Sequence, residues 1–462
     1  MAEPEPGTAA RLTSLPAAAP RSGRSGPVAA LIRPLAWAGI VTTLAMAAAG
    51  PAPAQEAGMT GAASCEAAAT AVAVSEDRIL VDGRPFAVRG AAGDGPLPLL
   101  AGLGATTLRT YGGDPGPALD AAQRAGLKVI VGLWLGHPRQ GANYADRGFV
   151  EAQLSAIRAT VVKYCNHPAL LMWGIGNEVE VDLADDSMVW PAIEEAAALV
   201  RSLDPAHPRM AVLAEIGGDK VSKIKQMAPS IDVLGVNSYG DALLSLPKRV
   251  RDAGWSGPTV VVEMGALGHW QAATSPWGAP FEPSSTQKAI QLRRYFNALQ
   301  PAGIGVIAFL WGQKQEVTAS WYGILLADGE WTEPAEAMAE SWGGRTPGGN
   351  HAPRIAYLRF AHDASAPFAS WRAGEEGAVV LEALDPDGDP LEATWEIVAE
   401  STVRSVGGDP EPAPRRFPEG LLAKDATGAR IGHLPPGRYR ITLVLRDGRG
   451  GAATANLPFE LR

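Results

Sequence analysis

Short apolar runs alternate with longer Ala-rich stretches from residue 79 onward. The runs are rich in Val, Ile and Leu and end in Gly, Asn or charged residues, a pattern typical of β-strands separated by helices. Eight strands are predicted, at residues 85–91, 106–112, 127–135, 169–178, 209–216, 232–240, 258–266 and 305–313. Runs such as VIVGLWL are apolar throughout, as expected for strands buried on both faces. Helices are predicted between the strands, for example at residues 114–126 and 149–164.

The repeated strand and helix units predict an α/β fold, a (β/α)8 TIM barrel. An open doubly wound sheet is the alternative, but no GxGxxG phosphate-binding loop follows the first strand. After a Gly/Pro-rich break at residues 343–353, the helical pattern gives way to short strands separated by turns. This change predicts a small immunoglobulin-like β-sandwich domain after the barrel.

The first part of the chain has the layout of an export signal. Arg21, Arg24 and Arg33 precede an apolar run at residues 35–50, and small residues at Ala52 and Ala54 follow it. We therefore predict a signal peptide over residues 1–54 and a secreted or periplasmic protein. The alternative is an uncleaved anchor, in which case the chain would contact a membrane. The remaining boundaries are predicted as an N-terminal linker at 55–78, the barrel at 79–345, a second linker at 346–352 and the β-sandwich at 353–462.

Composition narrows the range of ligands. The formal net charge is −9, which argues against a nucleic-acid partner because phosphate binding depends on clustered Lys and Arg. Thirteen Trp residues offer aromatic faces on which neutral sugars can stack. Cys65 and Cys165 form no metal or redox motif, and whether they pair is left open. No cofactor or metal is predicted; the acidic run at residues 385–389 suits either a calcium site or ordinary Asp-Gly turns.

Polar residues lie at the carboxyl ends of the predicted barrel strands, where chemistry in TIM barrels takes place. These residues are Arg89, Arg109, Tyr111, His137, Asn177, Glu178, Glu215, Asn237, Tyr239, Glu263, Trp311 and Gln313. Glycoside hydrolysis needs two carboxyl groups, one to protonate the leaving oxygen and one to attack the anomeric carbon. We predict Glu178 as the acid/base and Glu263 as the nucleophile. Glu215 is the rival carboxylate, and a lone Glu after a strand often only caps the next helix.

The surroundings of the two glutamates suit different roles. Glu178 follows an apolar run and adjoins Asn177, and burial raises a carboxyl pKa. A nucleophile instead needs donors that stabilise its charge, for which Arg109 and Tyr239 are candidates. His137, after the third strand, is a further candidate for substrate binding.

The runs WGIGNEVE around Glu178 and VVVEMGA around Glu263 resemble the acid/base and nucleophile strands of the retaining TIM-barrel glycosidases. Over residues 79–345 the similarity is greatest to the TIM-barrel domain of glycoside hydrolase family 2. The resemblance implies that Arg109 and Tyr239 orient Glu263, that Asn177 contacts the 2-hydroxyl of the sugar, and that Trp311 forms the floor of the −1 subsite. The run TLRTYGGDP at residues 107–115 is also similar to β-1,3-glucan hydrolases and glucanosyltransferases of the same clan.

These observations predict a retaining β-glycosidase that hydrolyses or transglycosylates a β-linked glycan, with a β-glucan favoured. The alternative is a non-catalytic glycan-binding or cell-envelope scaffold protein with a degenerate barrel site. A metal set of His137, His167 and His269 is less favoured than ordinary hydrogen bonding, because their spacing follows no strand or helix face. Some Trp side chains line either sugar subsites or the core: Trp134, Trp270, Trp277 and Trp321.

Overall fold

The structure is a computed structural model that describes residues 65, 71–363, 366–405 and 408–462. The predicted signal peptide, residues 1–54, and most of the predicted linker at 55–78 lie outside the described residues. The described residues belong to one compact unit, Gly61–Arg462. Within these ranges, no helix combines the length and the apolar character that a membrane crossing requires.

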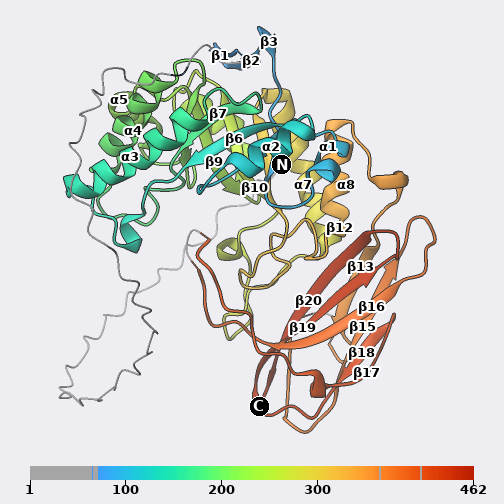
Figure 1. Cartoon of the computed structure of the whole chain (residues 1–462). Helices are drawn as coiled ribbons and strands as arrows, with labels where there is room; N and C mark the ends of the chain where they lie inside the picture. Colours follow the sequence, from blue (N-terminus) through green and yellow to red (C-terminus); the bar gives the residue numbers. More distant parts are fainter. Residues whose placement is uncertain (1–64, 66–70, 364–365, 406–407) are drawn as a thin grey trace, which may run out of the picture. The chain divides into compact units, whose positions relative to one another are not determined.

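Eight parallel strands close into a barrel in the order β10-β11-β4-β5-β6-β7-β8-β9 (Figure 1). They are β4 Arg89–Gly93, β5 Thr107–Arg109, β6 Lys128–Leu133, β7 Leu170–Ile175, β8 Arg209–Leu213, β9 Val233–Tyr239, β10 Thr259–Gly265 and β11 Gly305–Trp311. The predicted TIM barrel is confirmed, and closure of the sheet excludes the open doubly wound alternative.

Helices connect the strands and cover the outside of the barrel (Figure 1). They are α1 Leu97–Gly102, α2 Gly116–Arg124, α3 Arg147–Tyr164, α4 Val189–Leu203, α5 Lys220–Met227, α6 Ala242–Asp252, α7 Ser285–Leu299 and α8 Glu333–Trp342. Side chains cap two of the starts: Asp146 accepts from the amides of α3, and Ser284 with Gln287 forms a capping box on α7.

Two apolar layers hold the barrel together. Alternate strand residues point outward against the helices, as Val306 and Ala308 do, or inward to the barrel interior, as Ile307 does. A small antiparallel sheet precedes the barrel and adds Val72 and Ile79 to the interior core. Its strands are β1 Val72–Ser75, β2 Arg78–Val81 and β3 Arg84–Pro85. The interior is thus a packed core, which leaves the carboxyl end of the strands as the open end.

The C-terminal part is a two-sheet β-sandwich, which confirms that prediction. One sheet is ordered β12-β20-β19-β16 with β14 beside β20, and the other is ordered β13-β15-β18-β17. The strands are β12 Trp331–Thr332, β13 Arg354–Phe360, β14 Ala369–Trp371, β15 Gly377–Leu384, β16 Glu392–Ala399, β17 Leu421–Asp425, β18 Gly428–Ile431, β19 Gly437–Arg446 and β20 Gly451–Leu461. Large side chains of both sheets, such as Trp395 of β16 and Phe360 of β13, form its separate core.

The barrel and the sandwich share a polar interface. β12, which precedes the last barrel helix, pairs in parallel with β20 of the sandwich. Arg440 is buried in the sandwich, pairs with Glu400 at 2.8 Å and donates to the carbonyl of Pro280 in the barrel at 2.9 Å. A buried guanidinium with all these partners fixes the geometry between the two domains.

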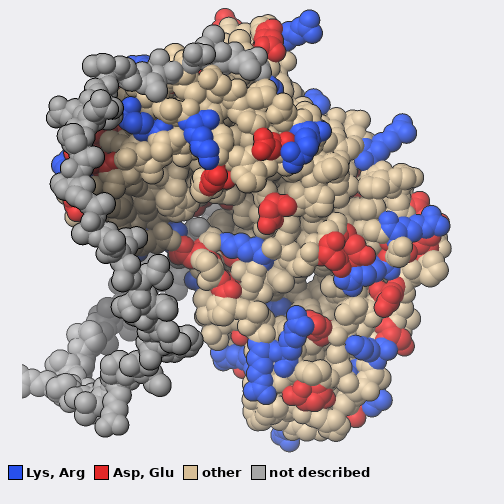
Figure 2. All heavy atoms as spheres, viewed as in Figure 1, with Lys and Arg blue, Asp and Glu red and all other residues tan. Residues whose placement is uncertain are grey.

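A disulfide joins Cys65 to Cys165, whose Cα atoms lie 6.1 Å apart, at the end of α3. This settles the pairing that the sequence left open. On the face drawn in Figure 2, Lys and Arg side chains are mixed with Asp and Glu over the described surface.

Candidate active site

The two predicted catalytic glutamates come from β10 and from the turn after β7. In β10, a register shift between Val261 and Glu263 lets Glu263 point to the barrel mouth directly after the inward-facing Val262. After β7, Gly176 has φ +66°, and a Cβ there would lie 2.6 Å from Val179. Glu178 follows with φ +52°, in the left-handed region that costs a side chain about 1 kcal/mol. The backbone is therefore shaped to place Glu178 at the mouth.

Glu263 is a buried carboxylate held by strong donors. Arg109 donates to its Oε1 at 3.0 Å, and the Tyr239 phenol donates to its Oε2 at 2.7 Å. Gly265 makes room for Tyr239, because a Cβ on Gly265 would lie 2.3 Å from the Tyr239 ring. Burial raises the pKa of Tyr239 well above its usual value, with the charge of Glu263 adding to the effect, so the phenol stays a donor. These contacts stabilise a negative charge on Glu263.

Arg109 links Glu263 to Asn177, the residue that precedes Glu178. Besides Glu263 it donates to the side chain of Asn177 at 2.6 Å and to the carbonyl of Val262 at 2.6 Å. Its guanidinium lies 4.3 Å from the centre of the Tyr111 ring, and burial raises the pKa of Tyr111 well above its usual value. The structure thus brings Arg109, Asn177 and Tyr239 together around Glu263.

Glu178 lies in a different environment. Burial raises its pKa to about 8, with the charge of Glu263 acting in the same direction. Asn237 donates to Glu178 Oε1 at 2.7 Å and also to Asn177 at 3.1 Å. Glu178 is partly exposed at the mouth and forms no salt bridge with any residue that the structure describes. At neutral pH it is therefore a carboxylic acid within reach of a ligand, whereas the oxygens of Glu263 accept from Arg109 and Tyr239.

The structure does not bring Trp311 to this cluster, so the expectation for Trp311 is wrong. Trp311 has no exposed surface, belongs to the layer between strands and helices, and donates to the carbonyl of Pro96 at 3.3 Å. Phe309 points inward instead, with its ring 6.5 Å from Tyr111 and 6.3 Å from Tyr239. A register irregularity between Phe309 and Trp311 changes which side chains of β11 face the interior.

His137 lies in the loop after β6, where the sequence placed it. Its ring is buried and packs 5.1 Å from Trp134, which is 45% exposed. Burial lowers the pKa of His137, and nearby Arg139 acts in the same direction. Neither ring nitrogen has a hydrogen-bond partner among the residues that the structure describes. His137 is therefore a neutral imidazole with unused hydrogen-bonding capacity near the mouth.

A third acid lies close to Glu263, and no sequence pattern predicts it. Glu316, in the loop after β11, is buried, pairs with Lys314 at 3.2 Å and lies 3.7 Å from the His269 ring nitrogen. Burial raises the pKa of Glu316, and Glu263 is near enough to add to that rise. A polar residue in a long loop carries no periodic signal, so only the fold places it here.

The remaining candidates have structural partners. Glu215 accepts from Arg249 at 3.0 Å and from Ser238 at 2.6 Å. Glu180, two residues after Glu178, is buried and pairs with Lys220 at 2.9 Å. His167 lies beside Asp120, remote from the mouth.

The four tryptophans considered for sugar subsites, Trp134, Trp270, Trp277 and Trp321, differ in burial. Trp321 is buried and donates to the Leu267 carbonyl, and Trp277 packs against Phe368. Trp270 is 62% exposed and its ring lies 5.3 Å from that of Tyr239. Trp134 and Trp270 are thus aromatic surfaces at the rim on which a sugar can stack.

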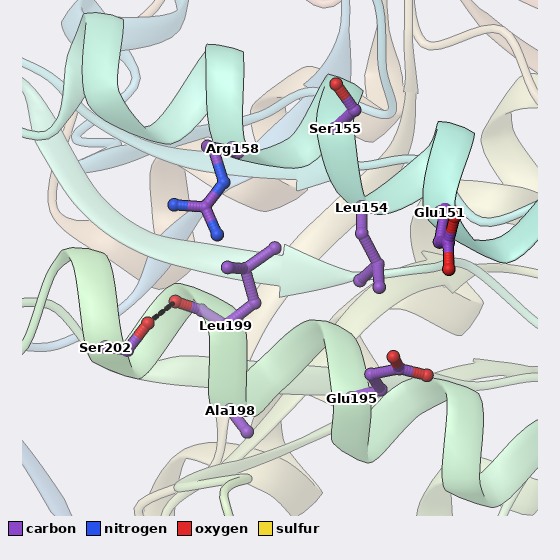
Figure 3. A pocket seen from close by; sticks show the side chains of 8 residues that line it. All are labelled: Glu151, Leu154, Ser155, Arg158, Glu195, Ala198, Leu199 and Ser202. Atoms are coloured by element: carbon purple, nitrogen blue, oxygen red, sulfur yellow. Dashed lines mark hydrogen bonds between the residues drawn. The ribbon is translucent and has the colours of Figure 1, made fainter. Parts of the chain in front are cut away.

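A depression of about 500 Å³ lies elsewhere, on the outer surface between α3 and α4. Figure 3 shows Leu154 and Leu199 pointing into it, with Glu151, Arg158 and Glu195 around them. It is open and belongs to the helical layer, remote from the carboxyl ends of the strands, so it is not part of the candidate active site.

Comparisons with known proteins agree with the resemblance drawn from the motifs. No family model matches the chain. Curated relatives include the β-glucuronidase of Rattus norvegicus, 29% identical over 198 residues, which cover 36% of this chain and 27% of the relative. The β-glucuronidase of Homo sapiens is 28% identical over 192 residues, with the same shares of 36% and 27%. The match therefore spans about a quarter of the length of these relatives.

Solved structures that match part of the chain include two β-glucuronidases. The β-D-glucuronidase of Dictyoglomus thermophilum is 21% identical with a TM-score of 0.49, and the match covers 59% of this chain and 53% of that one. The β-glucuronidase of Bifidobacterium dentium complexed with coumarin-3-O-glucuronide is 20% identical with a TM-score of 0.48, covering 60% and 49%.

Proposed function

We propose that the protein is a retaining β-glycosidase in which Glu178 is the acid/base and Glu263 the nucleophile. The observation that carries the proposal is the contrast between two neighbouring glutamates. Glu263 accepts from a guanidinium and a phenol, whereas burial holds the pKa of Glu178 at about 8. One fold thus presents a carboxylate and a carboxylic acid at the same place, which is the pair that glycoside hydrolysis with retention requires.

In the first step, Glu178 transfers its proton to the glycosidic oxygen while a Glu263 oxygen attacks the anomeric carbon. The carbon–oxygen bond of the leaving group breaks, the alcohol departs, and a glycosyl ester forms on Glu263. In the second step, Glu178, now a carboxylate, takes a proton from water, whose oxygen attacks the same carbon and releases Glu263. A sugar hydroxyl in place of water gives transglycosylation, with retention in both cases.

The neighbours of the glutamates have defined parts in this proposal. Asn237 holds Oε1 of Glu178 at 2.7 Å, which leaves Oε2 to carry the transferred proton. Asn177, fixed by Arg109, is placed to contact the sugar hydroxyl next to the anomeric carbon. Phe309 replaces Trp311 as the aromatic residue beneath the sugar, because its ring faces the interior beside Tyr239.

The charge pattern favours a neutral sugar, and among neutral glycans a β-glucan agrees with the run TLRTYGGDP. Several cations near the mouth are already paired with carboxylates in the described structure: Arg109 with Glu263, Lys314 with Glu316, and Arg139 with Asp409. None of these three is left unpaired for the carboxylate of a uronic acid, whose burial without a partner would be costly. A β-glucuronide is the second candidate substrate, favoured by the names of the matched relatives.

A panel of aryl β-glycosides and β-glucans tests the function directly. The wild-type protein is compared with Glu178→Gln, Glu263→Gln and the control Glu215→Gln, a strand-end glutamate held by Arg249 and Ser238. We expect turnover of a β-glucoside in preference to a β-glucuronide, its loss in the first two variants, and its survival in the control. A non-catalytic glycan-binding protein would give no turnover with any substrate. Activity unchanged in both Glu178→Gln and Glu263→Gln would refute the assignment.

We also propose that the protein acts outside the cytoplasm, in the periplasm or after secretion. The disulfide between Cys65 and Cys165 supports this location, because such bonds persist in oxidising compartments. Cell fractionation followed by N-terminal sequencing of the mature chain tests it. A start near residue 55 in the exported fraction is expected, and a full-length reduced protein in the cytoplasm would contradict it.

A further inference from the structure

The C-terminal domain reaches the mouth of the barrel through the connection between β16 and β17. Asp409 of this connection accepts from Arg139 at 2.6 Å and from Gln140 at 2.6 Å. Both donors lie in the loop that follows β6 and contains His137. The sandwich is therefore in contact with one of the loops that form the candidate active site.

The same connection contacts a second loop of the site. Glu411 accepts from the amide of Val317 at 2.7 Å, and Lys314 donates to the carbonyl of Gly408. Val317 and Lys314 flank Glu316, the third acid beside Glu263. Contacts on two sides of the mouth make residues 408–411 part of its wall.

A groove of about 430 Å³ lies between this connection and the barrel. Its barrel side is lined by Arg139 and Asp182, and its sandwich side by Val403, Arg404, Ser405, Asp409 and Pro410. This volume is within the range of small-ligand pockets. The two arginines and two aspartates balance in charge, and Val403, which is 42% exposed, adds an apolar surface. A lining of this kind suits a neutral ligand with hydroxyl groups and apolar C–H faces.

The groove lies on the Glu178 side of the site. Asp182 belongs to the turn that begins at Glu178, where the Val181 amide donates to the Glu178 carbonyl at 3.1 Å. Arg139 follows β6, the neighbour of β7 on the side away from β10. Since the acid contacts the glycosidic oxygen, space beyond Glu178 and away from Glu263 is where the leaving group of a substrate extends.

We propose that this groove is a subsite shared by the barrel and the C-terminal domain, which binds the leaving-group sugars of a neutral β-linked oligosaccharide. The proposal rests on the proposed function and extends it to chain length: the protein acts on oligosaccharides in preference to small glycosides. Arg404 and Asp182 hydrogen-bond sugar hydroxyls from opposite walls, and Val403 packs against a sugar face.

The test compares two substrates in each variant. One is the aryl β-glycoside that the wild type hydrolyses best, which has no leaving-group sugar, and the other is an oligosaccharide of four to six units of the same sugar. Arg404→Ala removes one wall contact, and Asp182→Asn changes the opposite wall while keeping a residue that tolerates φ +56°. Arg416→Ala is the matched control, because Arg416 pairs with Glu396 and its side chain is 72% exposed.

We expect the ratio of kcat/KM for the oligosaccharide to kcat/KM for the aryl glycoside to fall about tenfold in each groove variant, equivalent to about 1.4 kcal/mol. The ratio should be unchanged in Arg416→Ala. An unchanged ratio in both groove variants, or an equal fall in the control, would overturn the proposal. If the wild type hydrolyses neither substrate, the proposed function fails. The groove is then tested by calorimetric measurement of oligosaccharide binding to the wild type and the variants. Unaltered affinity in both groove variants would overturn the groove proposal.

Discussion

The phenol of Tyr239 lies 2.7 Å from Oε2 of Glu263, on the side opposite the Arg109 donor to Oε1. Each carboxylate oxygen thus has its own donor, and both donors come from the ends of barrel strands. The carboxylate is fixed in orientation as well as in charge, which pre-organises it for attack at one position.

Tyr239→Phe is expected to lower kcat/KM about 10- to 100-fold. The change leaves a buried carboxylate oxygen without its donor, which costs about 1 to 3 kcal/mol, and each 1.4 kcal/mol corresponds to a factor of ten in rate. Steady-state kinetics on an aryl glycoside measure the effect, and circular dichroism checks the fold. Wild-type kinetics in a folded variant would show that the phenol does not assist Glu263.

The pH dependence of activity should report Glu178. Because its carboxyl group must be protonated to act as the acid and its pKa is raised to about 8, kcat/KM should fall as pH rises above about 8. A substrate whose leaving group needs no protonation, such as a dinitrophenyl glycoside, should lose much of this alkaline fall. An identical pH profile in Glu178→Gln, at any residual rate, would assign the titration to another group.

The raised pKa of Glu178 also makes the stability of the protein depend on pH. The folded-state pKa of Glu178, about 8, lies above its ordinary value of 4.5, so the folded protein binds this proton more tightly than the unfolded chain. Its contribution to stability is complete below pH 4.5 and is lost as pH rises toward 8. Glu178→Gln should therefore flatten the fall in melting temperature over this interval. Parallel curves for wild type and variant would contradict the raised pKa.

Substitutions of Phe309 and Trp311 should have different effects, the first on substrate binding and the second on stability. Phe309→Leu removes an aromatic ring from the site and is expected to raise KM for the glycoside. Trp311→Phe affects a fully buried side chain between strand and helix, and should lower the melting temperature with KM retained. Kinetics and thermal unfolding of both variants decide between the positions. A raised KM in Trp311→Phe together with an unchanged KM in Phe309→Leu would instead indicate Trp311 as the residue beneath the sugar.

Much of the site followed from the sequence because parallel strands bring their carboxyl ends together. That rule alone predicts one end of the barrel as the place of both proposed catalytic glutamates and of Arg109, Asn177 and Tyr239. It failed for Trp311, because an apolar run does not reveal which of its residues face inward when a register irregularity intervenes. The contact of Asp409 with Arg139 joins positions 270 residues apart, and no local sequence pattern predicts such a contact.

The disulfide should contribute to stability alone. Replacing both Cys65 and Cys165 by Ala is expected to cost about 2 to 4 kcal/mol of unfolding free energy, because the bond closes a long loop in the unfolded chain. Denaturant unfolding measures the loss of unfolding free energy. The rate of substrate turnover per folded molecule should not change. A free thiol count of two in the protein purified from the exported fraction would show that the bond does not form there.

The central claim is that Glu263 forms a covalent bond with the sugar, and trapping that intermediate tests it most directly. A 2-deoxy-2-fluoro aryl glycoside of the preferred sugar slows both steps, so the glycosyl-enzyme accumulates and can be digested and sequenced by mass spectrometry. We predict one added sugar, located on Glu263, and none in Glu263→Gln. A label on another residue such as Glu178 or Glu215, or sustained turnover of ordinary substrate by Glu263→Gln, would contradict the account.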